Sequence, residues 1–456
     1  MFLKLSKISL YISLLSVVVV MSTILFPFIG GKDYFFRIAI EASVIFFLLW
    51  WSFEDHTEEA CRRITSAFKK PLFIAVTVFT VAMLLSTIFA LDSHGAFWSN
   101  FERGEGTFQF LHYYAMFFLM VVLFKEEKDW KFAFQVSSVA AVGMIAYGVL
   151  GVTGWANNFI TPKLGDLSKG FWADLIEPRF QGTLGNPAYV APYLMFSMFY
   201  AAYLWASSDK KKKWFAIAGW SLLIAFFFFF FLLSQTRGAM VGFGAAIVAF
   251  LAYFGFRQKR LRKWIFTLLA LVIVLGSGLV AFRHSSFVTK LPGGRIFDIA
   301  FSDDTLHTRL WTWGSAWQGF LERPVFGWGQ ENFSAVFDKY FDPRHFNPNS
   351  NSETWFDRAH SIIFDYLAET GAVGLLSYFS IFAVIFMLIF SKKKDGHEAS
   401  RAGAVGKALI FAMPIGYLIQ GLAIFDVLPM YINLFLFFAF VYYYFYNRSD
   451  HLASNK

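Results

Sequence analysis

Apolar runs of about 18 or more residues recur along almost all of this 456-residue chain. Each run is long enough to cross the hydrocarbon core of a membrane, which is about 30 Å thick. Charged residues make up only 16% of the sequence, against roughly 25% in soluble domains. The chain is therefore expected to be an all-α polytopic membrane protein in which one helical bundle accounts for nearly every residue.

The apolar runs predict twelve transmembrane helices. Their expected bounds are 8–29, 35–52, 72–91, 108–124, 131–153, 188–206, 214–233, 238–256, 264–282, 361–390, 408–425 and 429–446. The first run is long for a signal peptide and has no small-residue cleavage site, so we interpret it as a retained span. The chain then divides into nine spans in 1–282, a polar loop in 283–359, and three spans with a short tail in 360–456.

Positive charge alternates from loop to loop and sets the expected orientation. The basic loops contain Arg62, Arg63, Lys69 and Lys70; Lys125, Lys128 and Lys131; Lys210 to Lys213; Arg257 to Lys263; and Lys392 to Lys407. By the positive-inside rule these loops and both termini are cytoplasmic. In the loop 283–359, eight Lys/Arg nearly balance nine Asp/Glu. The net charge of +9 is thus explained by topology, and we expect no nucleic-acid partner.

Metal and nucleotide sites are not expected. The single cysteine, Cys61, excludes an internal disulfide and a cysteine cluster. Histidines of the predicted outer face lack the H-x-x-x-H spacing, and the only acidic pair in the long loop is the adjacent Asp303-Asp304. The chain also has no P-loop pattern. We therefore predict neither a metal nor a cofactor.

Two arginines lie where outer loops meet spans. Arg237 falls in a very short turn between two apolar spans, and Arg179 lies in the Gly- and Pro-containing segment 178–187 that enters the sixth span. A guanidinium is a permanently charged donor fork that suits phosphate groups. The alternative is an ordinary loop arginine whose stem snorkels along the bundle.

Segment 306–320 of the long loop has a helical pattern of large aromatic residues. Trp313, Trp317 and Phe320 recur at helical spacing, with Arg309 near the start. This pattern is typical of an amphipathic helix at a membrane interface, where tryptophan is favoured. The alternative is a purely structural interfacial helix.

The tenth span opens with His360, which directly follows Arg358-Ala359. A neutral imidazole at this position can take a proton from a hydroxyl group. A capping or merely buried histidine is the alternative. Glu369 lies deeper in the same span and needs a polar partner.

In their order along the chain, these segments resemble the bacterial O-antigen ligase and O-antigen polymerase superfamily. The resemblance is based on Arg179 with Asn186-Pro187, on 234–239 with Arg237, on 309–329, on Arg358-Ala-His360-Ser361, and on Glu369 to Gly374. The family often has asparagine where this chain has Ser361. By resemblance the fold is a GT-C-like transferase architecture of about 12 transmembrane helices with a long, partly helical periplasmic loop.

The resemblance implies a metal-independent, inverting glycan transfer on the outer face of the bacterial cytoplasmic membrane. The donor would be a glycan on undecaprenyl diphosphate. Arg179, Arg237 and Arg309 would bind the diphosphate and stabilise the leaving group's charge, with Arg309 also catalytic. His360 would be the general base, and Asn186, Arg358 and Glu369 would support the site.

Three acceptors fit this transfer: a lipid A-core sugar, another repeat unit, or a protein hydroxyl. They correspond to a ligase, a polymerase and a protein O-oligosaccharyltransferase, of which we favour the ligase. A flippase or transporter of lipid-linked sugars is an alternative of another class, but it would place polar groups near the midplane. A structural subunit of an envelope complex leaves the arginines and His360 without a role.

Overall fold

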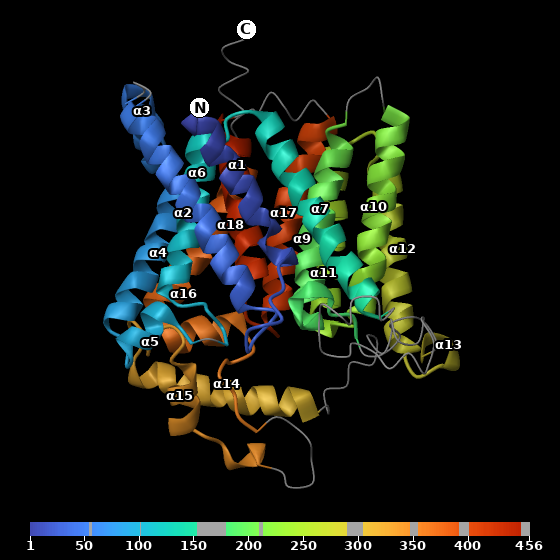
Figure 1. Cartoon of the computed structure of the whole chain (residues 1–456). Coiled ribbons are helices and arrows are strands. Elements are labelled where there is room, and N and C mark those ends of the chain that lie inside the picture. The colour runs from blue at the N-terminus through green and yellow to red at the C-terminus, as the bar shows by residue number, and fades with distance from the viewer. Residues whose placement is uncertain are drawn as a thin grey trace.

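The computed structural model describes residues 1–53, 57–100, 102–152, 179–208, 213–289, 304–346, 354–391 and 401–447. Secondary structure in these residues is helical throughout. Nine of the described helices are long and apolar enough to cross a membrane. The protein is a multi-pass α-helical membrane protein, as the apolar runs predicted (Figure 1).

The helices follow one another as a bundle interrupted by shorter segments. The first part consists of α1 (Phe2–Ser13), η1 (Leu14–Val18), α2 (Gly30–Phe53), α3 (Thr57–Phe68), α4 (Pro71–Ile88), α5 (Ser93–Trp98), α6 (Thr107–Leu123), α7 (Glu127–Val152), η3 (Gly182–Leu184) and α9 (Pro187–Ala206). The second part consists of α10 (Lys213–Leu233), α11 (Arg237–Arg257), α12 (Arg262–Ala281), α13 (Ser286–Thr289), α14 (Asp304–Glu322), α15 (Phe333–Lys339), η6 (Pro343–His345), α16 (Ile362–Phe390), α17 (Arg401–Gly421), α18 (Leu428–Tyr442) and η7 (Tyr443–Asn447).

The predicted count of twelve spans is matched only in part. The nine candidate spans in the described residues are α2, α4, α7, α10, α11, α12, α16, α17 and α18. Two further bundle helices, α6 and α9, correspond to predicted spans, although α6 has only 17 residues. The total of twelve therefore stays a prediction.

The predicted first span, 8–29, is not a continuous helix. The α-helix ends at Ser13, a 3₁₀ turn continues to Val18, and the chain then turns before α2 begins at Gly30. Side-chain donors form hydrogen bonds with backbone carbonyls that would accept from the backbone in a longer helix. Thr183 Oγ1 donates to Val17 O at 2.6 Å, and Lys32 Nζ donates to Val19 O at 2.7 Å.

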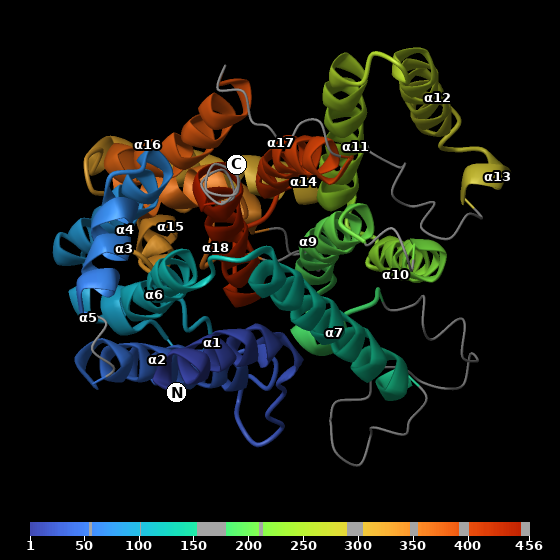
Figure 2. The ribbon, with the colours of Figure 1, turned by 90° about the horizontal axis from the view of Figure 1, so that it is seen from above.

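Viewed from above, α18 lies in the middle of the bundle, with α6, α7, α9, α16 and α17 around it (Figure 2). In the apolar stretch of α18, 89% of the residues are buried. Side chains such as Phe435, Phe438 and Phe440 are almost fully buried in the largest core cluster. A nearly all-apolar helix is stable at this position because neighbouring helices cover every side of it.

The outer polar segment lies across one end of the bundle. There α14 lies beneath the spans and packs on α15 and α16 (Figure 1). The predicted helix over 306–320 is confirmed as part of α14. Trp313 is partly buried, and its indole stacks on the Phe364 ring with the ring centroids 5.1 Å apart. The membrane-interface position of the helix stays a prediction. Trp317 is 46% exposed.

Helix α16 is broken at Gly371, whose φ of 62° and ψ of −165° are not helical. The sequence predicted one continuous span, 361–390. The break exposes backbone groups, and the chain 324–329 bonds to them: Trp328 N to Ala368 O at 3.0 Å, and Ala372 N to Pro324 O at 2.8 Å. Irregular backbone of this kind is tolerated in a membrane protein only where other protein groups satisfy it.

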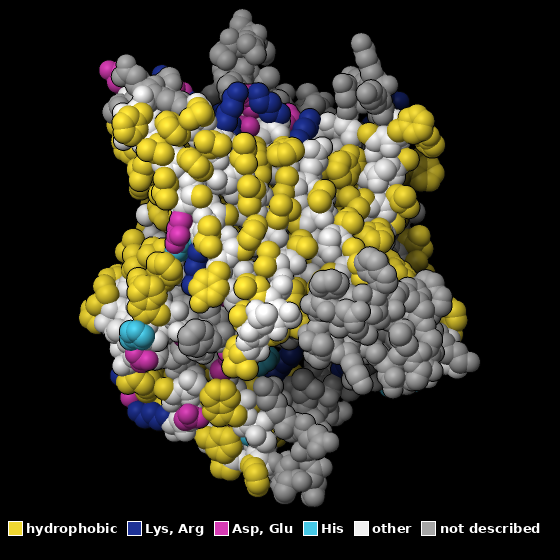
Figure 3. Space-filling view, in the orientation of Figure 1, with side chains coloured by type: hydrophobic (Ala, Val, Ile, Leu, Met, Phe, Trp, Pro, Cys, Tyr) yellow, Lys and Arg dark blue, Asp and Glu magenta, His cyan; other side chains and the backbone are white. Residues whose placement is uncertain are grey.

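A broad belt of hydrophobic side chains covers the face of the bundle that is seen in Figure 3. Lys and Arg side chains gather at the end of the bundle farthest from α14. This arrangement agrees with the positive charge expected on the cytoplasmic side. The orientation itself remains a prediction, which the belt and the basic end support.

Candidate functional site

His360 lies where the outer segment meets α16, in an unusual backbone conformation. Its φ is +54°, a region that non-glycine residues rarely occupy and that is often found at functional sites. Ring nitrogen Nδ1 lies 3.1 Å from Arg358 O. Because a carbonyl can only accept, Nδ1 carries the proton and donates it, so the neutral ring has its lone pair on Nε2. This nitrogen can act as a base.

Burial is the main cause that lowers the pKa of His360 from its usual 6.5 to about 4. The nearby charges of Arg309 and Arg103 lower it further, while Arg358 O and Asp357 oppose the shift. The imidazole is therefore neutral at physiological pH. The same interactions show that Arg309 on α14, predicted from sequence, lies close enough to His360 to act on its charge.

Buried ion pairs hold the chain just before His360. The Arg358 guanidinium pairs with Glu331 and, at 3.1 Å, with Glu369. Glu369 thus has the polar partner that its position in the span required. Asp365 Oδ1 accepts from Ala359 N at 2.6 Å, and Ile362 N donates to Ile424 O at 3.1 Å. Together these contacts hold the backbone in its strained form.

Helix α14 also fixes this segment from outside. Trp313 Nε1 donates to Ala359 O at 2.9 Å. Arg309 lies one helical turn before Trp313 on the same helix, and residues four apart share a helix face. The position of Arg309 beside His360 therefore depends on the packing of α14 on α16.

A site residue that the sequence did not reveal is Arg103, between α5 and α6. Its Nε and Nη2 donate to the two carboxylate oxygens of Asp357 at 2.6 and 2.9 Å. Burial opposes the charge of Arg103, but these bonds and neighbouring acids raise its pKa overall. The guanidinium lies 5.1 Å from the centre of the Phe425 ring, and His360 meets that ring edge-on at 5.1 Å.

The only sequence signal for Arg103 was its place in the outer segment 92–107, beside glycines. Its partner Asp357 is 254 residues away, so no local pattern linked the two. Asp357 directly precedes Arg358 and had no role assigned from sequence.

The two other predicted arginine segments come together at a second place. Arg179 Nε donates to Ser234 O, and its Nη2 donates to Thr236 Oγ1, both at 2.9 Å. Thr236 is the residue before Arg237, with which α11 begins. Asn186 caps α9 by accepting from Ala188 N at 2.8 Å, so its contact is structural.

The chain that connects α17 to α18 links the two places. Gly238 of α11 lies against Ala423. Ile424 O then bonds the start of α16, and the Phe425 ring meets His360 and, at 6.1 Å, Tyr189 of α9. The start of α11, next to Arg237, and His360 thus both contact the segment 423–425.

The molecular surface is hollowed between the bundle and the outer segment, and basic and histidine side chains are visible there (Figure 3). In the described ranges, no three His, Cys, Asp or Glu side chains are grouped as a metal site requires. The residues gathered around His360 therefore present the guanidinium groups of Arg309 and Arg103 and one basic imidazole nitrogen. Such groups can stabilise a developing negative charge and accept a proton.

Part of the chain matches a known protein family. The family model described as O-antigen ligase matches residues 194–379. A search of curated proteins finds no match. The matched stretch includes Arg237, Arg309, Arg358, His360 and Glu369, whereas Arg103 and Arg179 lie before it. This match supports the resemblance to the O-antigen ligase and O-antigen polymerase superfamily over residues 194–379.

Proposed function

We propose that the protein transfers a glycan from undecaprenyl diphosphate to an acceptor hydroxyl, by inversion and without a metal ion. The observation that supports this most strongly is His360, a neutral imidazole with its Nε2 lone pair available beside Arg309 and Arg103. We place the reaction on the outer face of the bacterial cytoplasmic membrane, with twelve spans and both termini inside.

In the proposed reaction, His360 Nε2 takes the proton of the acceptor hydroxyl as that oxygen attacks the anomeric carbon of the donor sugar. The bond between this carbon and the diphosphate oxygen breaks, and the diphosphate leaves with the electron pair. Arg309, Arg237 and Arg179 balance the charge that grows on the leaving group. Arg358, Glu369 and Asn186 keep the surrounding backbone in place.

An apolar cavity provides a place for the polyprenyl chain. It is an open groove of about 250 Å³ between α9, α10, α11 and α17, and its lining includes Phe243, Ala246 and Phe250. These α11 residues lie 6 to 13 positions beyond Arg237, or about 9 to 20 Å along the helix at 1.5 Å per residue. A diphosphate at Arg237 would therefore have its lipid tail directed into this cavity.

For the acceptor we favour a lipid A-core sugar, which would make the protein a ligase. A repeat unit would make it a polymerase, and a protein hydroxyl would make it a protein O-oligosaccharyltransferase. The three products differ in kind: one added glycan, a ladder of lengths, or a glycosylated protein.

The test is transfer by the purified protein in proteoliposomes, with an undecaprenyl diphosphate-linked glycan and a mixture of the three acceptors. We expect wild type to release undecaprenyl diphosphate and form a glycan product. His360→Ala should lose activity by roughly 10²- to 10⁴-fold, as for other general bases, while it still binds donor. Donor movement between leaflets without any product would identify a flippase instead.

A second test concerns the diphosphate site. Arg237→Ala should raise the KM for donor and lower kcat, and Arg237→Lys should restore only part of the loss because a lysine lacks the planar fork. Arg260→Ala, at the basic end of the bundle, is the matched control and should leave both constants unchanged. Full recovery with lysine would show that charge alone is required.

A further inference from the structure

Helix α2 carries a row of exposed side chains along the outside of the bundle. Its members follow one another at steps of four and three positions, so they share one face of the helix. The opposite face of α2 is buried, and the helix packs on α1 and α6. Each member of the row is at least half exposed: Tyr34, Ile38, Glu41, Ile45 and Leu48. This row, the α2 face, has the spacing of a helix–helix contact, with one charged residue at its centre.

Glu41 lies near the middle of a membrane span. It is the twelfth of the 24 residues of α2, which is one of the candidate spans. At 1.5 Å per residue it lies about 17 Å from either end of the helix. Figure 3 shows acidic, histidine and basic side chains together inside the hydrophobic belt. Ionisable side chains at this depth are costly and almost always face the interior of a bundle, whereas Glu41 is exposed on the outside.

His112 of α6 meets Glu41 but leaves its carboxylate without a full set of donors. His112 Nε2 lies 3.2 Å from Glu41 Oε1, and its Nδ1 lies 2.8 Å from Phe108 O. Because this carbonyl can only accept, Nδ1 carries the proton of the neutral ring and Nε2 has none to donate. The pair therefore forms a hydrogen bond only when it takes up a further proton. In the part of the chain that the structure describes, Glu41 Oε2 accepts no hydrogen bond.

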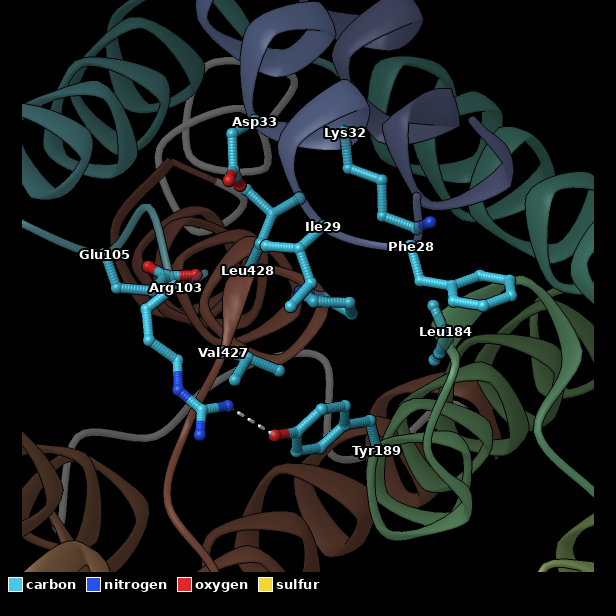
Figure 4. Close-up of a pocket in the computed structure, with 11 residues that line it drawn as sticks. Phe28, Ile29, Lys32, Asp33, Arg103, Glu105, Leu184, Tyr189, Val427 and Leu428 are labelled. Carbon is cyan, nitrogen blue, oxygen red and sulfur yellow. Dashed lines mark hydrogen bonds between the residues drawn. The ribbon is translucent and has the colours of Figure 1, made fainter. Parts of the chain in front are cut away.

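Arg37, one turn earlier on α2, does not neutralise Glu41. The two side chains form no ion pair among the described residues, and Arg37 Nε instead donates to Gln109 Oε1 at 2.5 Å. The charge of Arg37 acts on Asp33 and Glu105. These two carboxylates line a small pocket of about 20 Å³ (Figure 4). Arg37 thus already serves two other acids, and Glu41 needs a cation from outside the chain.

We propose that the α2 face binds a transmembrane helix of another protein, which places a lysine or arginine against Glu41. A basic side chain supplies both the opposite charge and the hydrogen bonds that the carboxylate lacks. Ile38 and Ile45, about one turn to either side, pack on apolar residues of that helix. The single charged position fixes how the two helices align along their length.

A second copy of this chain fits the α2 face less well than a basic helix does. Most dimers are two-fold symmetric, so that the same patch of each copy faces the other. In a membrane this symmetry would bring Glu41 opposite Glu41 at the same depth. Like charges repel strongly where water is excluded. The charge of the α2 face therefore favours a different protein as the partner.

The experiment uses the full chain in nanodiscs, with a donor dye on Cys61. This is the single cysteine of the chain; it is exposed and lies on α3, the helix that follows α2. The probes are three synthetic transmembrane peptides that share one leucine-rich host sequence and carry lysine, leucine or glutamate at the centre. Each peptide has an acceptor dye at one end, so energy transfer gives its apparent Kd. Wild type is compared with Glu41→Leu and with a control, Leu271→Ala, on the exposed surface of α12.

We expect the lysine peptide to bind wild type about 3- to 30-fold more tightly than the leucine peptide, as for one polar contact between membrane helices. The glutamate peptide should bind no better than the leucine peptide. Glu41→Leu should remove the preference for lysine, and Leu271→Ala should keep it. Glu41→Leu should also resist denaturant at least as well as wild type, because an apolar side chain replaces a carboxylate that faces lipid. Loss of binding in this variant is then not loss of fold.

Two results would overturn the proposal. One is an equal Kd of wild type for the lysine and leucine peptides, or a preference for lysine that persists in Glu41→Leu. The other comes from mixing donor- and acceptor-labelled copies of the protein without peptide. Energy transfer between copies that Glu41→Leu abolishes would assign the α2 face to a second copy. None of these measurements requires glycan transfer, so their outcome is independent of the proposed function.

Discussion

Helices α12 and α16 have nearly the same mean hydropathy, 2.4 and 2.5, yet they differ in burial, in continuity and in polar content. In the apolar stretch of α12 only 6% of the residues are buried, against 39% in that of α16. Helix α12 has no described break, whereas α16 breaks at Gly371 and contains the buried Asp365 and Glu369. Hydropathy identifies a span, but it does not tell whether the span faces lipid or builds a site.

The difference lies in how each helix satisfies its backbone and its polar groups. In α12 each interior carbonyl bonds within the helix, and nearly all side chains of its apolar stretch are at least partly exposed on the bundle surface. In α16 the break frees backbone carbonyls, which accept hydrogen bonds from the segment 324–329. The carboxylates of Asp365 and Glu369 bind the two residues just before His360. A helix of this second type gains stability from the outer segment, so its variants should be sensitive where those of α12 are not.

The largest contrast should come from two arginines. Arg358→Ala leaves Glu331 and Glu369 as buried carboxylates without their partner, which should cost roughly 3–5 kcal/mol of stability. Arg262→Ala, at the start of α12, removes a side chain that bonds Phe256 O at the surface and should change stability by less than about 0.5 kcal/mol. Unfolding in detergent with increasing denaturant measures both. Equal losses would show that the Arg358 pairs do not stabilise the fold.

Two glycines make the next comparison. Gly371→Ala places a Cβ 2.4 Å from Val325 O at a φ of 62°, which should cost about 1–3 kcal/mol and speed hydrogen exchange in 324–329. Gly276 of α12 has open space where its Cβ would lie. Gly276→Ala should therefore be neutral or stabilising by up to about 1 kcal/mol. Unchanged exchange in Gly371→Ala would mean that the outer segment does not depend on the break.

Local sequence patterns predicted much of this molecule. Runs of apolar residues gave most helix positions, and the helical spacing of Trp313 and Trp317 indicated α14. The arginine segments at Arg179 and Arg237 were found separately, and the structure brings them together. In each case the signal lies within a few consecutive residues.

What the sequence did not reveal depends on distant contacts. The break at Gly371 was missed because a glycine is also compatible with a continuous membrane helix, and only the docking of 324–329 favours the break. Arg103 was missed because its partner Asp357 is far along the chain. Asp33 lies just before the predicted second span, and only the folded chain brings it into the same small pocket as Glu105.

The smallest expected effect is the pH dependence of activity. It tests whether the surroundings of His360 at the start of α16 lower its pKa. At pH 5.5 an imidazole with a pKa of about 4 is about 97% neutral, whereas one with the ordinary pKa of about 6.5 is about 9% neutral. The kcat/KM for donor should thus stay nearly constant from pH 8 to pH 5.5 and fall only near pH 4.

Acceptor is kept saturating in this measurement, because burial raises the pKa of Glu105 to about 7 and this carboxyl group titrates within the same pH range. Stability provides an independent check of sign. The folded state binds a proton at His360 less readily than the unfolded chain, so this residue should reduce stability as pH falls below about 6.5. His360→Gln should remove that part of the acid sensitivity. A loss of kcat/KM with its midpoint near pH 6.5 would instead show that His360 is exposed to solvent. The packing of α14 on α16 would then not exclude water from the site.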